Sequence, residues 1–251
     1  MSEGRSADDP TDDPTGDRAD VAAAVGALPA TGHVAAFAPT FRALRASIAV
    51  PSLLRDLAPG VDLDRLATLL ALTDPNAAHV LARRSELARS EQPAGPGAGW
   101  ALVAFTCPAR PSRFTDGSHG VWYAGLAVET AIAETAFHLE RQLRQYGEPA
   151  QTVPFQVLSA EIAGAFVGLR QLPAPAYAAV HHRHDHAAAR QVGAIVRRRG
   201  DDGVTYDSVR HPGGTCLAVF RPRAIHYPRP THRVDHAWTG TELRPGVVRP
   251  A

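Results

Sequence analysis

Apolar residues recur at helical spacing in the first third of the chain and at strand spacing further on. Leucines three or four positions apart predict helices over residues 51–58 and 63–72, and Asp74-Pro75 predicts the start of a third helix through Leu87. The apolar run 100–107 and the short segment 121–123 then predict two strands, the first of them buried. The pattern therefore changes from helical to mixed near residue 100.

A longer helix is predicted over residues 128–146, because its apolar residues follow the helical period and Gly147 comes next. Residues 186–199 predict another helix, which Gly200 ends. Strands are predicted over 155–162, 165–169, 203–206 and 215–220. Together these elements predict an α+β fold with a central sheet, flanking helices and a helical N-terminal part.

Composition divides the chain into five expected parts. Residues 1–20 carry seven acids and two arginines, a net charge of −5, with almost no large apolar residue. Residues 1–30 are therefore predicted to be a disordered acidic tail. The parts expected after it are a helical N-terminal part (31–90), a Gly/Pro-rich loop (91–99), the core of the domain (100–226) and a C-terminal extension (227–251).

Charge and cysteine content narrow the classes of function. The whole chain has a net charge of +1, so the body outside the acidic segment carries +6, which suits phosphorylated small molecules or nucleic acid. The chain has no lysine, which excludes Schiff-base and Walker-type lysine chemistry and leaves arginine to bind phosphate. Two cysteines, Cys107 and Cys216, and the lack of a membrane-spanning apolar run predict a cytoplasmic protein.

Residues typical of a ligand site are spread over several predicted elements. Arg113 and Tyr123 lie near the short strand 121–123, and Ser208 follows strand 203–206. On helix 128–146, Glu134 is about 200° around from Ile132, and so lies outside the apolar stripe. Its neighbours on that face are mostly small, so a ligand could approach the carboxylate closely. A solvated surface glutamate is the ordinary alternative.

Several separated blocks, in order, resemble the RES domain, a family named for its arginine, glutamate and serine. The blocks are Arg113-Phe114, Gly120–Ala124, Glu129–Thr135, Gly203–Arg210 and Cys216–Pro222. The resemblance covers roughly residues 40–225. Phe41-Arg42 resembles an early arginine strand of the family, although Ala43 stands where the family often has tyrosine, and Arg45 is the alternative arginine.

The resemblance implies a fold similar to that of ADP-ribosyltransferases, with a central β-sheet core. It implies a toxin that consumes NAD as a substrate, without a cofactor, by cleaving the bond between nicotinamide and ribose. The cleavage would occur by hydrolysis, by phosphorolysis or by ADP-ribosyl transfer. The expected partner is an antitoxin of the Xre helix-turn-helix type, and the expected assembly is a homodimer without direct binding to nucleic acid or to a membrane.

The resemblance and the chemistry of glycosidic cleavage together suggest roles for six residues. Glu134 would stabilise an oxocarbenium-like transition state, and arginines would bind the pyrophosphate. Ser208 would orient the ribose or the nicotinamide amide, and the ring of Tyr123 would stack on nicotinamide. The expected catalytic residues are Glu134, Arg113 and Ser208, the expected substrate-binding residues are Arg42, Tyr123 and Arg210, and no metal ligand is expected.

Two other functions compete with this one. The segment His181–His186 holds four histidines and one aspartate, which is typical of metal ligands and suggests a metal-dependent hydrolase. However, no matching second motif accompanies it, and Asp185 can cap the helix that follows. The basic body suggests a nucleic-acid-binding module, but the chain lacks the alternation of basic and aromatic residues that single-strand binders use.

Overall fold

The structure is a computed structural model that describes residues 14–28, 34–46, 89–93, 95–106 and 110–251. The helices predicted over 51–58, 63–72 and 74–87 lie outside the described residues, as does Cys107. None of the helices in the described ranges is long and apolar enough to cross a membrane.

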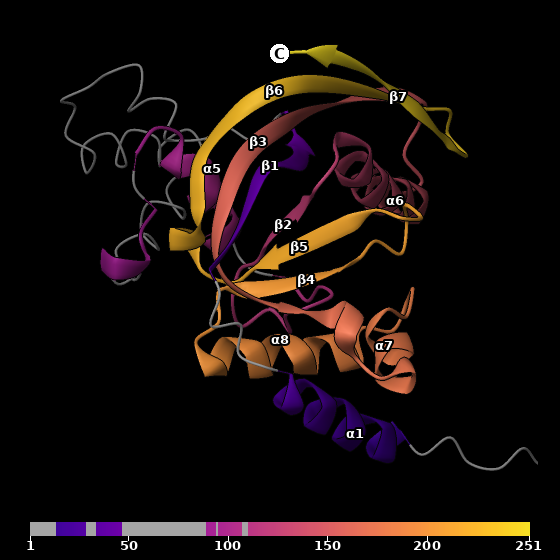
Figure 1. Cartoon of the computed structure of the whole chain (residues 1–251). Helices are drawn as coiled ribbons and strands as arrows, with labels where there is room; N and C mark the ends of the chain where they lie inside the picture. The colour runs from indigo at the N-terminus through magenta and orange to yellow at the C-terminus, as the bar shows by residue number, and fades with distance from the viewer. Residues whose placement is uncertain (1–13, 29–33, 47–88, 94, 107–109) are drawn as a thin grey trace, which may run out of the picture.

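The described helices and strands confirm the predicted α+β class, because helices pack on a sheet whose strand pairs are mostly antiparallel (Figure 1). The described helices are α1 (Pro14–Ala27), α5 (Ala98–Thr106), α6 (Val128–Tyr146), α7 (Ala174–Val180) and α8 (Ala187–Arg199), with short 3-10 helices at Arg89–Glu91, Leu169–Gln171 and Pro222–Ala224. The described strands are β1 (Val34–Arg45), β2 (Trp122–Gly125), β3 (Gln151–Gly168), β4 (Gly203–Asp207), β5 (Thr215–Val219), β6 (Ile225–Trp238) and β7 (Leu243–Pro250).

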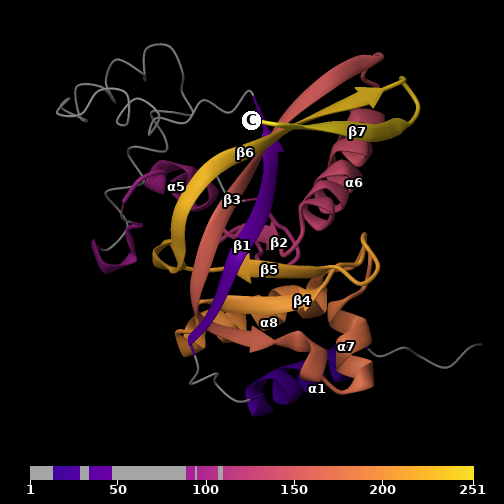
Figure 2. The ribbon, with the colours of Figure 1, turned by 45° about the horizontal axis from the view of Figure 1, so that its top comes forward.

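The strands form one mixed sheet in the order β1-β2-β5-β4-β3-β6-β7, and β1 also pairs with β3. Strand β3 joins the two parts of this sheet: most of its length lies between β1 and β6, whereas Phe166–Gly168 pairs parallel with β4. Figures 1 and 2 show an arch of β1, β3, β6 and β7 above a second group formed by β2, β5 and β4. Helix α6 packs beside both groups, against β1 and β2.

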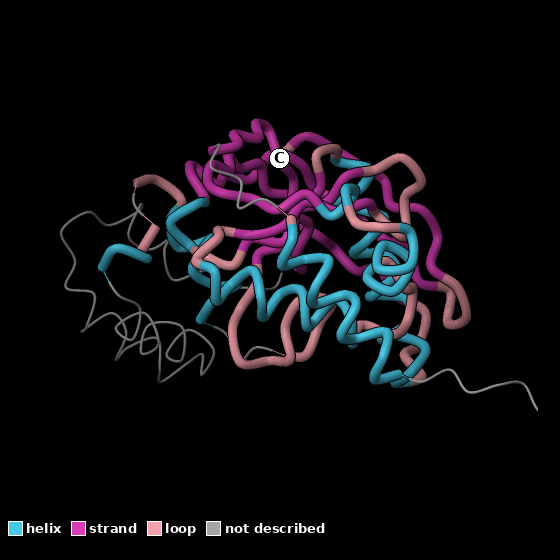
Figure 3. Tube along the Cα trace, turned by 60° about the horizontal axis from the view of Figure 1, so that its bottom comes forward, coloured by secondary structure: helices cyan, strands magenta, loops and turns pink. Residues whose placement is uncertain are grey.

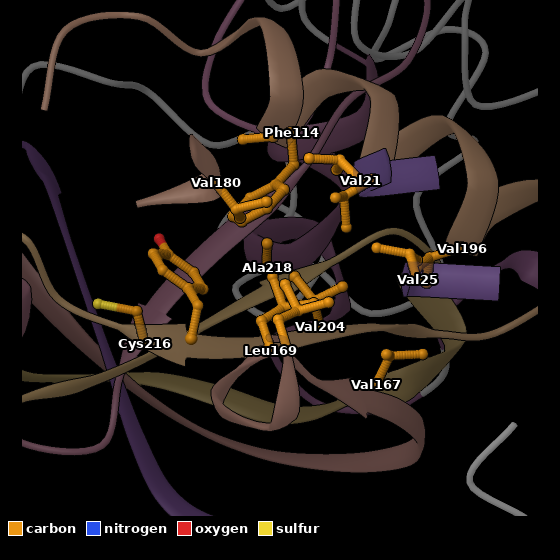
Figure 4. Close-up of a cluster of buried hydrophobic side chains, with 14 of the residues drawn as sticks. Val21, Val25, Phe114, Val167, Leu169, Val180, Val196, Val204, Cys216 and Ala218 are labelled. Carbon is orange, nitrogen blue, oxygen red and sulfur yellow. The ribbon is translucent and has the colours of Figure 1, made fainter. Parts of the chain in front are cut away.

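Apolar side chains form three clusters around the sheet. The first packs α1, α7 and α8 against β4 and β5, with Val21, Val25, Val180, Val196 and Val204 inside it (Figure 4). The second joins α5 to β2, β3 and β5, and the third joins the C-terminal half of α6 to β3 and β6. Figure 3 shows the resulting layer of helices, in cyan, in front of the strands.

Most of the predicted elements after residue 120 are confirmed. Helix α6 has the predicted bounds, and Gly147 ends it in the left-handed conformation, with φ 61°. Gly200 ends α8 in the same way, with φ 87°. The predicted strands 121–123, 203–206 and 215–220 are present as β2, β4 and β5, and the two predicted over 155–162 and 165–169 are one strand, β3.

The strand predicted over residues 100–107 is wrong, because Ala98–Thr106 forms helix α5. An apolar run of this length does not distinguish a buried strand from a buried helix by its periodicity. Gly95 and Gly97, both with positive φ, form the turn that starts the helix, and the N–H of Trp100 donates to the carbonyl of Gly97 at 2.8 Å. The helix then buries Trp100 and Ala101 in the second cluster.

The disordered tail predicted over residues 1–30 is wrong for residues 14–27, which form helix α1. Val21 and Val25 are one helical turn apart and fully buried against α8. Two apolar residues on one face are enough to hold a helix in place when a partner helix covers them. Arg199 fixes the end of the helix, because its Nη1 donates to the carbonyls of Val25 and Leu28 at 3.1 and 3.3 Å.

Two further expected parts differ from the structure. The part expected to be helical, 31–90, contains strand β1, which pairs with β3 over most of its length. The segment expected to be a C-terminal extension, 227–251, contains most of β6 and all of β7, both within the sheet. Their strand pattern is hidden in sequence by arginine, histidine and proline, because β6 buries only some of its side chains and β7 buries none.

Candidate active site

A cavity of about 460 Å³ lies where β1, β2 and the first half of α6 meet the loops that precede β2 and α8. Five of the six predicted site residues line this cavity, and the sixth, Ser208, binds one of them. The structure thus brings together residues that the sequence separates by up to 168 positions, from Arg42 to Arg210. The lining residues among those six are Arg42, Arg113, Tyr123, Glu134 and Arg210.

Glu134 and Ser208 form the central contact of the cavity. The Ser208 hydroxyl donates to Oε1 of Glu134 at 2.6 Å, and its oxygen accepts the backbone N–H groups of Arg210 at 3.2 Å and His211 at 2.9 Å. Ser208 is only 8% exposed, so water does not compete freely for this bond. The turn after β4 therefore holds the serine, and the serine orients the carboxylate that α6 presents.

The beginning of α6 is packed tightly around this contact. A Cβ at Gly125 would lie 2.9 Å from the backbone nitrogen of Ala131, so only glycine fits at the end of β2. Thr130 is fully buried, and its Oγ1 lies 2.9 Å from Nδ1 of His211. The helix that carries Glu134 is thereby fixed both to β2 and to the turn that carries Ser208.

Arg113 is a buried arginine, 8% exposed, that serves the structure as well as the cavity wall. Its Nη1 donates to the carbonyls of Val180 at 3.0 Å and His182 at 3.1 Å, which fixes the end of α7 and the loop that follows. A Cβ at Gly193 of α8 would overlap the carbonyl oxygen of Phe114, so this glycine lets α8 touch the segment that carries Arg113.

Arg42 projects from β1 into the same cavity. Its guanidinium lies over the ring of Trp122, 4.7 Å from the centroid, and Nη1 donates to the carbonyl of Tyr123 at 3.5 Å. The alternative, Arg45, is the last residue of β1 and is not among the residues that line the cavity. The structure therefore favours Arg42 over Arg45 as the arginine of this strand.

Arg210 closes another side of the cavity. Its guanidinium carbon lies 3.3 Å from the ring centroid of Phe137, and Nη2 donates to the carbonyl of Arg183 at 2.5 Å. Burial lowers the pKa of Arg210, and the charges of Arg183, Arg113 and Arg141 lower it as well, while Glu134 opposes the shift. The guanidinium therefore lies in a crowded cationic environment that an anion would relieve.

The hydroxyl of Tyr123 is held by protein groups. It accepts the N–H of Phe114 at 3.1 Å and lies 2.7 Å from Oγ of Ser112. Burial raises the pKa of Tyr123, so the hydroxyl is neutral at physiological pH. Its side chain forms part of the cavity wall, and stacking on a nicotinamide ring stays a prediction.

Several lining residues were not predicted from the sequence. Arg141 follows Glu134 by seven positions, and Arg190 lies near the start of α8, so helical spacing from Glu134 could have indicated only Arg141. Cys216 of β5 lies 4.0 Å from Oε1 of Glu134, and burial raises the pKa of its thiol to about 12. The thiol is therefore protonated and is a poor nucleophile.

The histidine-rich segment between α7 and α8 does not form a metal site in the described part of the chain, where no three His, Cys, Asp or Glu side chains are grouped to hold a metal. The ring of His181 stacks on that of Tyr177, with 4.0 Å between the ring centroids. Nδ1 of His182 accepts the N–H of Asp185 at 2.8 Å. Asp185 in turn accepts the N–H of Ala187, the first residue of α8, at 2.8 Å, as expected for a helix start. These contacts give His181, His182 and Asp185 structural roles that need no metal.

Charge decides which ligand the cavity suits. Among the lining residues, Glu134 is the only carboxylate and is surrounded by basic groups. Arginines bind phosphate oxygens through paired, charge-assisted hydrogen bonds. An anionic ligand with a cleavable bond near Glu134 fits this arrangement. The lining arginines are Arg42, Arg113, Arg141, Arg190 and Arg210.

Comparison with known proteins gives one family. No curated protein matches the chain. Among solved structures, the crystal structure of the M. tuberculosis MbcT–MbcA toxin–antitoxin complex matches with a TM-score of 0.40 and 11% identity, over 86% of this chain and 91% of that one. The family model described as the RES domain matches residues 86–239, which include Arg113, Glu134 and Ser208. The resemblance seen in the ordered blocks is thereby confirmed, and the chain belongs to the RES domain family.

Proposed function

We propose that this protein consumes NAD by cleaving the bond between nicotinamide and ribose, and that it is the toxin of a toxin–antitoxin pair. The observation that carries the proposal is the contact of Glu134 with Ser208, at 2.6 Å, inside a cavity lined by arginines. Membership of the RES family supports it, because the resemblance implies NAD as the substrate.

The proposed chemistry assigns the carboxylate and the arginines separate tasks. When the C–N bond breaks, its electron pair stays with the nicotinamide nitrogen and positive charge develops on the ribose. The Glu134 carboxylate stabilises that charge, and the Ser208 hydroxyl holds it in place. The arginines bind the pyrophosphate, which carries two negative charges. An acceptor, which is water, phosphate or a protein side chain, then bonds to the ribose carbon and releases its proton.

Purified protein should convert NAD to nicotinamide without added metal, because the site described needs only side chains. Nicotinamide and the ADP-ribosyl product are separated by chromatography after incubation in plain buffer, with phosphate and with cell extract, each with and without EDTA. Persistence of NAD in all three mixtures contradicts the proposal. Activity that EDTA abolishes would contradict the metal-free mechanism.

Ser208→Ala should lower NAD turnover by about tenfold to a hundredfold, because a hydrogen bond to a charged group contributes about 1.5–3 kcal/mol. The substitution leaves Glu134 Oε1 without its donor and leaves the N–H groups of Arg210 and His211 without their acceptor. Steady-state kinetics measures the effect. Ser118→Ala, which removes an exposed hydroxyl outside the cavity, is the control and should keep full turnover. Unchanged turnover in Ser208→Ala would remove this serine from the mechanism.

We also propose an antitoxin partner, because an enzyme that exhausts NAD harms its own cell. The resemblance to the RES family implies that this partner is of the Xre helix-turn-helix type. We expect this partner to cover the mouth of the cavity between Arg113 and Glu134. Adding the product of a neighbouring gene to the NAD assay tests the expectation. Light scattering of the protein alone tests the predicted homodimer.

A further inference from the structure

Two polar atoms of residues on the cavity wall are buried and have no hydrogen-bond partner within the described residues. They are Nε2 of His186 and Nη1 of Arg210. Buried polar groups in folded proteins nearly always have a partner, so an unpartnered one needs a reason. Since both residues line the same cavity, a ligand group that occupies it can supply the missing acceptor once the two side chains turn toward it.

His186 differs in this respect from the first two histidines of its segment. The ring of His181 stacks on Tyr177, and its Nε2 accepts the N–H of Asp207 at 3.2 Å. His182 accepts the N–H of Asp185. These two rings stabilise the loop between α7 and α8, whereas His186, which lines the cavity at the start of α8, has an Nε2 without a partner in the described structure.

Basic groups surround His186 from each neighbouring element. Burial and, to a smaller extent, the charged groups near it lower the pKa of His186 to about 4, so the ring is neutral in the free protein near pH 7. Glu134 is the carboxylate of the cavity, and the exposed His184 also lines it. The groups that act on His186 are Arg113 before β2, Arg190 of α8, His138 of α6 and Arg210 after β4.

We propose that His186 and Arg210 together bind an anionic oxygen of the substrate's pyrophosphate, and that His186 takes up a proton when this oxygen binds. The inference rests on the proposed function, since it assigns a further positioning residue to the same substrate. The reason for the proton uptake is electrostatic: the two negative charges of the pyrophosphate offset the repulsion by the arginines. A protonated imidazole can then donate from Nε2 to the bound oxygen.

Binding of ADP-ribose tests the proposal, because ADP-ribose keeps the pyrophosphate and has no nicotinamide to lose. The two negative charges of its pyrophosphate do not change between pH 5.5 and 7.5, so any pH dependence comes from the protein. If the bound state restores His186 to its ordinary pKa of about 6.5, ADP-ribose should bind about tenfold more tightly at pH 5.5 than at pH 7.5. Titration calorimetry at constant ionic strength measures the affinities and the proton uptake.

His186→Gln should bind ADP-ribose with an affinity that changes less than about twofold between the two pH values, because glutamine does not titrate. His119→Gln is the matched control: burial also lowers the pKa of His119 to about 4, and its Nε2 is also buried without a partner in the described structure, yet His119 does not line the cavity. This control should keep the tenfold change.

Three results would overturn the proposal: no binding of ADP-ribose, an affinity of the unchanged protein that is the same at both pH values, or a full pH dependence in His186→Gln. Thermal unfolding of each variant at both pH values shows whether it is folded. The NAD assay on the unchanged protein separates this inference from the proposed function. NAD cleavage together with pH-independent binding of ADP-ribose rejects only the role of His186, whereas the absence of cleavage rejects the function.

Discussion

Glu134→Gln should lower the turnover of NAD at least about a hundredfold and leave its apparent affinity nearly unchanged. Glutamine has the same shape and can still accept the hydrogen bond of Ser208, but it lacks the negative charge. A charge that acts on the transition state contributes to turnover far more than to binding of the substrate. Single-turnover measurements of nicotinamide release, with the enzyme in excess over NAD, report the change in the rate of cleavage directly.

Glu140→Gln is the matched control for this variant. Glu140 lies on the same helix, outside the cavity, where it forms an exposed pair with Arg144. Exposed pairs of this kind contribute less than about 0.5 kcal/mol, so both folding and turnover should stay near normal. If Glu134→Gln kept the turnover of this control, the carboxylate would have no place in the mechanism.

Gly193→Ala should destabilise the protein by about 1–3 kcal/mol, which is typical of an added methyl group in a closely packed interior. The new Cβ would overlap the carbonyl oxygen of Phe114, which is backbone and cannot rotate away. Helix α8 would have to move from the segment that holds Arg113, so turnover should fall together with stability. Urea unfolding measures the free energy of unfolding.

Gly26→Ala provides the comparison, because a Cβ at this position of α1 meets no atom within 4 Å. Alanine forms helices better than glycine, so this variant should be unchanged or more stable by up to about 1 kcal/mol. Equal stability of the two variants would mean that the approach of α8 to Phe114 is not as close as the structure has it.

The sequence predicts those parts of the fold whose pattern is local. The bounds of α6 follow from its apolar period and from Gly147, and both belong to the helix itself. Helix α5 and strand β6 depend on partners far along the chain: α5 is apolar enough for either conformation, and β6 is a strand because β3 lies beside it. Helix α1 likewise depends on α8, which covers Val21 and Val25. Local patterns carry no information on such partners.

The candidate site likewise has residues that the sequence indicates and contacts that it does not. The ordered blocks indicate Arg113, Tyr123 and Glu134, and the structure places all three on one cavity. The bond between Ser208 and Glu134 joins residues 74 positions apart, so no local pattern could predict it. The same holds for His186, whose segment suggested a metal, because composition cannot show which of several histidines are already held by neighbouring groups.

The pairing of β1 with β3 has a consequence for how the chain folds during synthesis. Thr40 of β1 donates to the carbonyl of Ala160, 120 residues later, and β1 finds its other partner in β2. The ribosome therefore releases β1 long before β2 and β3 are synthesised. Until then, the backbone N–H and C=O groups of β1 lack their partners in the sheet. Such distant contacts make folding slow and leave the early strand open to aggregation. A chain interrupted before residue 151 would lack β3, the strand that joins both halves of the sheet, and we expect it to be degraded.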